Sequence, residues 1–197
     1  MPSIAEYSSV GSEPVPGLPD LLKTSRTLLN PTPSSFSMTV DAGEYAGYRI
    51  AVTGTGFVYY QDEPLLGEFS VIEVFDDADR SFLSYRWTDV NGDPVSSGQE
   101  VSVLWQGTHV YLSVDEVLGS DGQEMPAEIR ANDLIDLAGG DDSLASSWAP
   151  IIRGGDGNDR FSDIGQYGDP LAQIFGDGGD DQFVDVTGEV YGGAGDD

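Results

Sequence analysis

Cysteine is absent from the 197 residues of this chain, so neither a disulfide framework nor a thiolate metal site can form. Positive charge is also scarce: eight Lys and Arg residues stand against 35 Asp and Glu residues, and the formal net charge is −27. Such a polyanion repels a phosphate backbone, so nucleic acid is not an expected partner, whereas hard cations are the natural counter-charge. Because self-repulsion destabilises a compact state, we expect either partial disorder or bound metal ions.

A long hydrophobic run and a secretory leader are missing as well. No apolar stretch approaches the roughly 20 residues of a membrane-spanning helix, so no transmembrane segment is expected. Residues 1–10 lack the basic start and apolar core of a cleaved signal peptide. Export, if it occurs, is therefore expected to use a different signal. The absence of cysteine is compatible with a calcium-rich, oxidising exterior.

Catalytic signatures are scarce too. The single histidine, His109, falls in a predicted strand, where a structural role is favoured over that of a general base. Nothing in the chain resembles the His-Glu-x-x-His helix of zinc proteases or the Gly-x-Ser-x-Gly elbow of hydrolases. We therefore expect this chain not to be an enzyme.

Proline content and hydrophobic alternation divide the first 120 residues into two parts. Residues 1–35 hold six of the eleven prolines and are predicted to form a lead segment. Residues 36–120 contain short runs with period-two alternation, separated by turn-forming residues. These runs include Tyr48, Ile50 and Val52, then Val101, Val103 and Trp105, then Val110, Leu112 and Val114. We predict an antiparallel, β-sandwich-like domain over residues 36–120.

One motif in this domain has the spacing of a calcium loop. Asp89, Asn91, Asp93 and Glu100 occupy positions one, three, five and twelve of an EF-hand. Pro94, however, stands where that loop needs glycine, and both flanks have the pattern of strands rather than helices. A hairpin with an Asn-Gly turn is therefore the favoured interpretation.

Residues 121–197 contain a repeat of nine residues. Residues 154–162 fit the template Gly-Gly-x-Gly-x-Asp-x-apolar-x throughout, and residues 176–184 depart from it only at the second position. Residues 139–144 keep its second half and residues 192–197 keep its first half. A degenerate copy at residues 131–135 places Asp133 in register with Asp142.

The template has a direct physical interpretation. Glycines permit the positive φ angles and close backbone approach that turn carbonyl oxygens inward. The aspartate at position six adds a charged oxygen. A hard ion that takes six to eight oxygen ligands suits this mixture, and Ca²⁺ tolerates irregular geometry better than Mg²⁺ does.

Two apolar rows are phased with the repeats. One row stands two residues after each aspartate (Ile135, Leu144, Phe161 and Phe183), and the other stands two residues before a first glycine (Ile152, Ile174 and Val190). Aspartates 142, 159, 181 and 197 are 17, 22 and 16 residues apart, close to two nonapeptides per coil. We predict a right-handed parallel β-roll with a ladder of Ca²⁺ between adjacent turns. A disordered acidic tail would explain the composition but not this phasing.

The repeats closely resemble the RTX family, the hemolysin-type calcium-binding repeats of bacterial exoproteins. In that family, calcium bridges successive turns through backbone carbonyls and the repeat aspartate, and the roll folds after export through a type I secretion channel. The resemblance implies carboxylate ligands at Asp142, Asp159, Asp181 and Asp197. It also implies metal ligation, mainly through backbone carbonyls, at Gly154, Asp156, Gly157, Gly176, Gly178, Gly192 and Ala194.

The function expected from this resemblance is that of a secreted, extracellular bacterial protein that binds Ca²⁺ as its cofactor. Its expected partners are calcium ions and the type I secretion apparatus, without a cleaved N-terminal signal. Because the chain ends inside a repeat at Asp197, we expect a truncated roll whose open end allows self-association. Two alternatives stay open: an accessory or secretion module of an exoenzyme such as a lipase or protease, with the catalytic part elsewhere, and an adhesin.

Overall fold

The chain is nearly all β in its computed structural model, which confirms the predicted class. The structure describes residues 3–8, 15–16, 18–22, 26–89, 91–99, 101–104, 113–120, 123–125, 130–165 and 172–197. The chain divides into two compact units, residues 1–5 with 18–110 and residues 6–17 with 111–197, and the boundary falls inside strand β1 (Ser3–Tyr7). None of the helices in these described ranges is long and apolar enough to cross a membrane.

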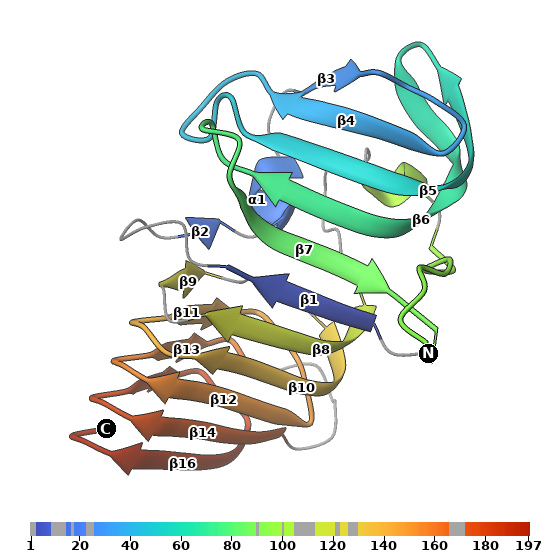
Figure 1. Cartoon of the computed structure of the whole chain (residues 1–197). Coiled ribbons are helices and arrows are strands. Elements are labelled where there is room, and N and C mark those ends of the chain that lie inside the picture. The colour runs from blue at the N-terminus through green and yellow to red at the C-terminus, as the bar shows by residue number, and fades with distance from the viewer. Residues whose placement is uncertain are drawn as a thin grey trace. The chain divides into compact units, whose positions relative to one another are not determined.

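The first unit is built on an antiparallel sheet of five strands in the order β7-β6-β5-β4-β3 (Figure 1). These strands are β3 (Arg26–Leu29), β4 (Ser35–Val40), β5 (Arg49–Tyr60), β6 (Glu63–Phe75) and β7 (Ser81–Trp87). Because successive residues of a strand point to opposite faces, the register aligns the predicted apolar residues across the sheet. Met38 pairs with Ile50, and Ile50 pairs with Val74, and all three are buried.

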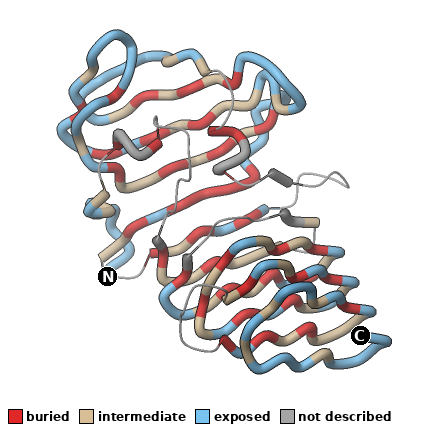
Figure 2. Tube along the Cα trace, turned by 180° about the vertical axis from the view of Figure 1, so that it is seen from behind, coloured by how far each residue is buried: buried red, intermediate tan, exposed pale blue. Residues whose placement is uncertain are grey.

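Two short helices lie on one face of this sheet. Helix α1 (Leu18–Leu22) lies behind the sheet in Figure 1 and in front of it in Figure 2, and Leu18, Leu21 and Leu22 are buried. The 3₁₀ helix η1 (Val101–Leu104) packs against β6. All the described strands of this unit after β1 belong to the single sheet, so the second sheet of a sandwich is not found among them.

The segment around Val101 corrects the predicted strand. Its alternation of Val101 and Val103 is typical of a strand, but residues 101–104 form η1. The reason is that a helix with three residues per turn places Val101 and Leu104 on the same side, and both of these residues are fully buried. Trp105 and His109 lie outside the described residues.

The Asp89 motif forms a tight turn. Asp89 Oδ1 accepts the backbone N–H groups of Asn91 at 2.8 Å and of Asp93 at 3.0 Å, and Thr88 and Pro94 form an antiparallel bridge. These N–H groups hold the pKa of Asp89 below its usual value. The carboxylate therefore serves the turn, as the hairpin interpretation expects.

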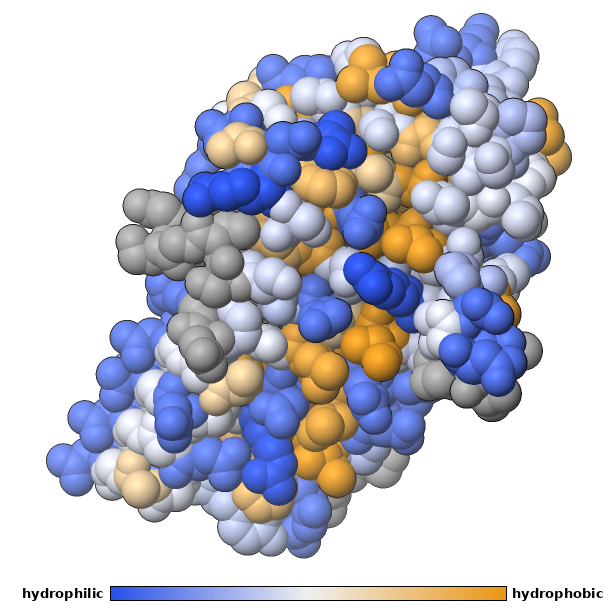
Figure 3. Space-filling model, in the orientation of Figure 1, coloured by the Kyte–Doolittle hydropathy of each residue, from blue (hydrophilic) through white to orange (hydrophobic). Residues whose placement is uncertain are grey.

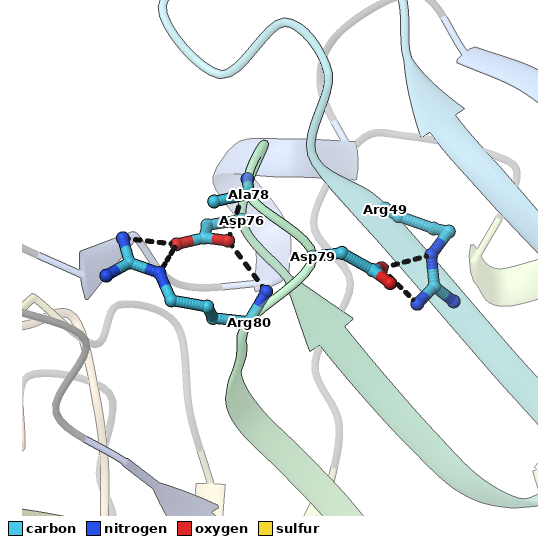
Figure 4. A network of polar contacts seen from close by, with 5 residues as sticks. All are labelled: Arg49, Asp76, Ala78, Asp79 and Arg80. Carbon is cyan, nitrogen blue, oxygen red and sulfur yellow. Dashed lines mark hydrogen bonds and ion pairs between the residues drawn. The ribbon is translucent and has the colours of Figure 1, made fainter.

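The turn between β6 and β7 is held by the buried Asp76. Its Oδ1 accepts the N–H groups of Ala78 at 3.0 Å and of Arg80 at 2.8 Å, and its Oδ2 accepts Arg80 Nε at 2.7 Å (Figure 4). Burial alone would raise the pKa of Asp76, but the Arg80 amide, the Arg80 guanidinium and the Ala78 amide outweigh it and lower the pKa. Asp79, in the same turn, instead pairs with Arg49 at 2.6 Å and is 74% exposed.

Asp76→Asn is expected to lower the free energy of unfolding by about 1–3 kcal/mol, because an amide cannot replace both acceptor oxygens of this buried carboxylate. Asp79→Asn is the matched control: it removes the same charge from an exposed ion pair, so its effect should stay below about 1 kcal/mol. Asparagine tolerates the φ of 61° that Asp79 adopts. Urea denaturation measures both changes, and equal losses would contradict the role of Asp76.

The second unit contains a parallel β-solenoid of about four turns, which agrees with the predicted parallel roll (Figure 1). The solenoid has two parallel sheets, which we call the longer and the shorter sheet after the length of their strands. The longer sheet contains β8 (Ser113–Ser120), β10 (Arg130–Ala138), β12 (Ile151–Asp156), β14 (Ala172–Gly178) and β16 (Gly188–Ala194). The shorter sheet contains β11 (Ser143–Ala145), β13 (Arg160–Ser162) and β15 (Gln182–Val184). A further pair joins β2 (Val15–Pro16) to β9 (Glu124–Met125). Since β8 pairs in parallel with β10, the parallel sheet begins ahead of residue 121.

Two in-register columns of side chains form the core of the solenoid. The longer sheet contributes Val117, Ile135, Ile152, Ile174 and Val190, and the shorter sheet contributes Leu144, Phe161 and Phe183. Buried and exposed residues alternate along the coils, as Figure 2 shows. Val190, in the last coil, is 42% exposed.

The degenerate copy at residues 131–135 is a strand and not a turn. Ile135 pairs with Ile152 on β12, so it belongs to the longer sheet and not to the row of Leu144 in which the sequence placed it. Asp133 lies within β10 and is exposed. Nine residues are only half a coil, so Asp133 is not in register with Asp142, and the predicted alignment is wrong at this copy.

Candidate metal centre

Four glycine turns stack along one edge of the solenoid. They cover residues 137–142, 154–159, 176–181 and 192–197, each numbered here as positions one to six. The strand register places Gly155 opposite Asp177 and Asp177 opposite Gly193, so equal positions of successive turns face each other. Nine of the fifteen acidic residues of residues 132–197 lie in these turns. The negative charge of the solenoid is therefore concentrated along this edge.

The outward face of the longer sheet differs from that edge. Figure 3 shows apolar side chains over these strands with hydrophilic ones on either side. Ile151 is 37% exposed, and Tyr191 is 46% exposed with its ring stacked on Phe175 at 4.8 Å. The acidic turns and the apolar surface therefore lie on different sides of the same coils.

The aspartates at position six form a ladder that the predicted spacing anticipates. Asp142 N donates to Asp159 Oδ1 at 2.9 Å, and Asp159 N donates to Asp181 Oδ1 at 2.9 Å. Asp181 N donates to Asp197 Oδ1 at 3.0 Å. Each of these carboxylates is therefore oriented by the backbone of the coil before it, which leaves its second oxygen available to other partners.

A second ladder at position five was not foreseen. Asp141 Oδ1 accepts Asn158 N at 2.8 Å, Asn158 Oδ1 accepts Asp180 N at 2.8 Å, and Asp180 Oδ1 accepts Asp196 N at 2.9 Å. Its direction is reversed, because here the later coil donates to the earlier one. The sequence signal was an Asp or Asn before every repeat aspartate.

The second carboxylate oxygens of Asp159 and Asp181 are buried without a hydrogen-bond partner. Asp159 is 1% exposed and Asp181 is 4% exposed. Burial, together with the neighbouring charge of Asp181, raises the pKa of Asp159 to about 6 against the lowering effect of the Asp142 amide. Burial also raises the pKa of Asp181. A pKa of about 6 leaves Asp159 mostly ionised at neutral pH, so a buried anionic oxygen lacks a counter-charge.

Each of these oxygens occupies the space left by a missing side chain at position one. A Cβ on Gly154 would stand under 3.0 Å from Asp159 Oδ2 and 2.8 Å from the carbonyl oxygen of Gly176 in the next coil. A Cβ on Gly176 would likewise stand under 3.0 Å from both Asp181 Oδ2 and the carbonyl oxygen of Gly192. We call these two spaces the Asp159 cradle and the Asp181 cradle. Each brings a carboxylate oxygen and a carbonyl oxygen together, which is the donor chemistry that Ca²⁺ prefers.

Glycine at position four lets the turns stack closely. Gly157 has φ 137°, and a Cβ there would stand under 3.0 Å from the carbonyl oxygen of Gly140. A larger residue would therefore push the coils apart as well as strain the backbone. Position two is less strict, since Asp177 takes a left-handed φ of 73° there.

The structure separates the predicted carbonyl ligands into two groups. Gly176 and Gly192 place their carbonyl oxygens beside the cradles. The position-three carbonyls instead accept the position-four N–H of the preceding coil: Asp156 O from Gly140 at 2.7 Å, Gly178 O from Gly157 at 2.6 Å, and Ala194 O from Gly179 at 2.8 Å. Gly157 O lies against Gly179. Gly154 lacks the Cβ that would otherwise fill the Asp159 cradle.

Asp142 and Asp197 stand at the two ends of the position-six ladder. Asp197 Oδ2 lies against Gly192 of its own turn, but no later coil adds a carbonyl among the residues described. Position one of the Asp142 turn is Leu137 rather than glycine. No three His, Cys, Asp or Glu side chains converge on one point in the described ranges, so an ion held by these turns requires backbone carbonyls.

Comparisons with known proteins add no relative to this picture. The chain matches no model of a protein family. It matches no curated protein and no solved structure either, so the functional assignment rests on the geometry of the turns.

Proposed function

We propose that the second unit is a right-handed calcium-binding roll of the RTX type, in which the stacked turns bind Ca²⁺ and binding is coupled to folding. The observation that carries the proposal is the pair of buried, unpartnered oxygens of Asp159 and Asp181, each beside a backbone carbonyl. A bound Ca²⁺ would supply the positive charge that these oxygens lack.

The energetics favour coupling between ion binding and folding. Leaving a buried polar atom unsatisfied costs about 1–3 kcal/mol, and more when it is charged. Residues 132–197 carry fifteen acidic residues and two arginines, so bringing the coils together also brings like charges together. A ligand that binds only the folded state stabilises it by mass action, and structural metals act in this way.

The same chemistry supports a function outside the cell. Extracellular calcium modules bind at about 10⁻⁴ to 10⁻³ M, well above cytosolic free calcium. The roll would therefore stay expanded in the cytosol and fold after export, for which the type I secretion apparatus is the proposed partner. The absence of cysteine and the acidic composition support a secreted protein, and the resemblance of the repeats to the RTX family supports a bacterial one.

We propose a binding module without enzymatic activity of its own. An accessory or secretion module of an exoenzyme such as a lipase or protease would contain the same calcium roll and differ only in what accompanies it, so the gene-level sequence decides between them. Adhesion through the first unit is a third candidate. The observation that favours it is the exposed apolar end of the β5–β6 hairpin, where Tyr60 is 62% exposed and Leu66 is 55% exposed. Binding to immobilised glycans tests this candidate.

Adding millimolar Ca²⁺ to the chelated full-length chain is expected to increase the β-sheet signal in far-UV circular dichroism and to raise the melting temperature. Mg²⁺ at the same concentration is the control, because it requires near-ideal octahedral geometry and gives up its water reluctantly. An unchanged spectrum with Ca²⁺, or an equal response to Mg²⁺, would contradict the proposed function.

A further inference from the structure

Position one distinguishes the first glycine turn from the others. The residues at this position are Leu137, Gly154, Gly176 and Gly192. Gly139 pairs with Asp156 and Ile135 pairs with Ile152, so Leu137 stands opposite Gly154. Leu137 is 1% exposed and therefore points into the solenoid.

The backbone of the first turn follows the same path as the later ones. A Cβ on Gly155 would stand under 3.0 Å from the carbonyl oxygen of Ala138, and one on Gly157 would meet the carbonyl oxygen of Gly140 in the same way. Gly140 N also donates to Asp156 O at 2.7 Å, as Gly157 N does to Gly178 O at 2.6 Å. The first and second turns therefore stack in the same way, and at position one Leu137 stands where the second turn has Gly154.

This side chain decides whether a cradle exists. In the second and third turns, the Cβ position of the position-one glycine lies under 3.0 Å from the unpartnered carboxylate oxygen of the same turn. A real Cβ and that oxygen cannot share this space. Because Leu137 carries an isobutyl side chain, which begins with a Cβ, the Asp142 carboxylate cannot place an oxygen where Asp159 and Asp181 do.

We infer that Leu137 interrupts the ion ladder, so that the Asp159 and Asp181 cradles take up Ca²⁺ while the first turn takes up none. This inference rests on the proposed function and identifies the residue that decides which turns act. In this inference the buried Leu137 side chain takes the place of the cradle, while the Asp142 backbone N–H still donates to Asp159 Oδ1 as the Asp159 N–H does to Asp181 Oδ1. Position one is thus the determinant of ion stoichiometry in this chain.

Isothermal titration calorimetry of the full-length chain with CaCl₂ tests the inference through the number of ions bound. Leu137→Gly is expected to bind one equivalent more than the wild type. Leu137→Ala is the matched control: it also removes core volume but keeps the Cβ, so its stoichiometry should equal that of the wild type. Adding Asp142→Asn to Leu137→Gly should remove the extra equivalent.

The converse variant keeps the test decisive if Leu137→Gly does not fold. Gly154→Ala places a Cβ in the Asp159 cradle and is expected to bind one equivalent fewer than the wild type. Unchanged stoichiometry in Gly154→Ala, or in a folded Leu137→Gly, overturns the inference while leaving calcium binding itself intact. A wild type that takes up no Ca²⁺ refutes the proposed function instead.

Discussion

Exchanging Asp159 and Asp181 together for asparagine is expected to abolish the calcium-dependent stabilisation of the chain. One site saturated at a hundredfold excess over its Kd contributes about 2.7 kcal/mol, so two lost sites remove about 5 kcal/mol of ligand-dependent stability. The asparagine variant keeps the shape of the carboxylates but lacks their charge. Thermal unfolding with excess Ca²⁺ and with chelator measures the loss.

The sign of the effect should reverse when calcium is removed. In chelator, wild-type Asp159 and Asp181 leave anionic oxygens buried without a partner, and neutral amides avoid that penalty. The double variant should then be at least as stable as the wild type. A purely structural role predicts that the variant is less stable in both conditions, so the absence of a crossover would count against the ligand role.

Position five offers the matched control for this experiment. Asp141→Asn with Asp180→Asn removes two charges from the adjacent position, where the chain itself carries Asn158. Asn158 Oδ1 already accepts a backbone N–H at 2.8 Å, so asparagine keeps this ladder intact. The control variant should retain its response to Ca²⁺. An equal loss in both double variants would point to bulk charge rather than to the cradles.

Phe161→Ala is expected to lower the free energy of unfolding of the calcium-loaded chain by about 3–5 kcal/mol. Phe161 is fully buried, pairs with Leu144 across the shorter sheet and stacks on Phe183 with ring centroids 5.2 Å apart. Its deletion leaves a cavity in the middle of the core that the neighbouring coils cannot close without breaking their register. Urea denaturation in saturating Ca²⁺ gives the change.

Phe175→Ala removes the same side chain from the outward face of the longer sheet. Phe175 is only partly buried and stacks on Tyr191 with ring centroids 4.8 Å apart. The loss should be about 1 kcal/mol, in the range of one aromatic pair. If the two phenylalanine variants lost equal stability, the assignment of the core to the space between the two sheets would be wrong.

Much of the solenoid could be predicted because its information is local and periodic. The side of a strand on which a residue lies depends on parity, and the position of a turn depends on the recurrence of glycine and aspartate. The spacings of 17, 22 and 16 residues therefore predict which aspartates share hydrogen bonds across coils. The same alternation wrongly predicted a strand at Val101, because burial of Val101 and Leu104 in a single turn of helix decided the local structure.

By itself, the sequence determined the charge, the coil length and the identity of the position-six aspartates, because each depends on composition or on a repeat that can be counted along the chain. Only the tertiary structure decided which carboxylate oxygens of the cradles are left without a partner, which carbonyls lie beside them, and that Leu137 is buried at the equivalent position of the first turn. These features depend on atoms brought together from coils 16 to 22 residues apart. Differences of a few tenths of an ångström in the distances between such atoms decide whether an oxygen or a methyl group fits. These differences cannot be predicted from a pattern along the chain.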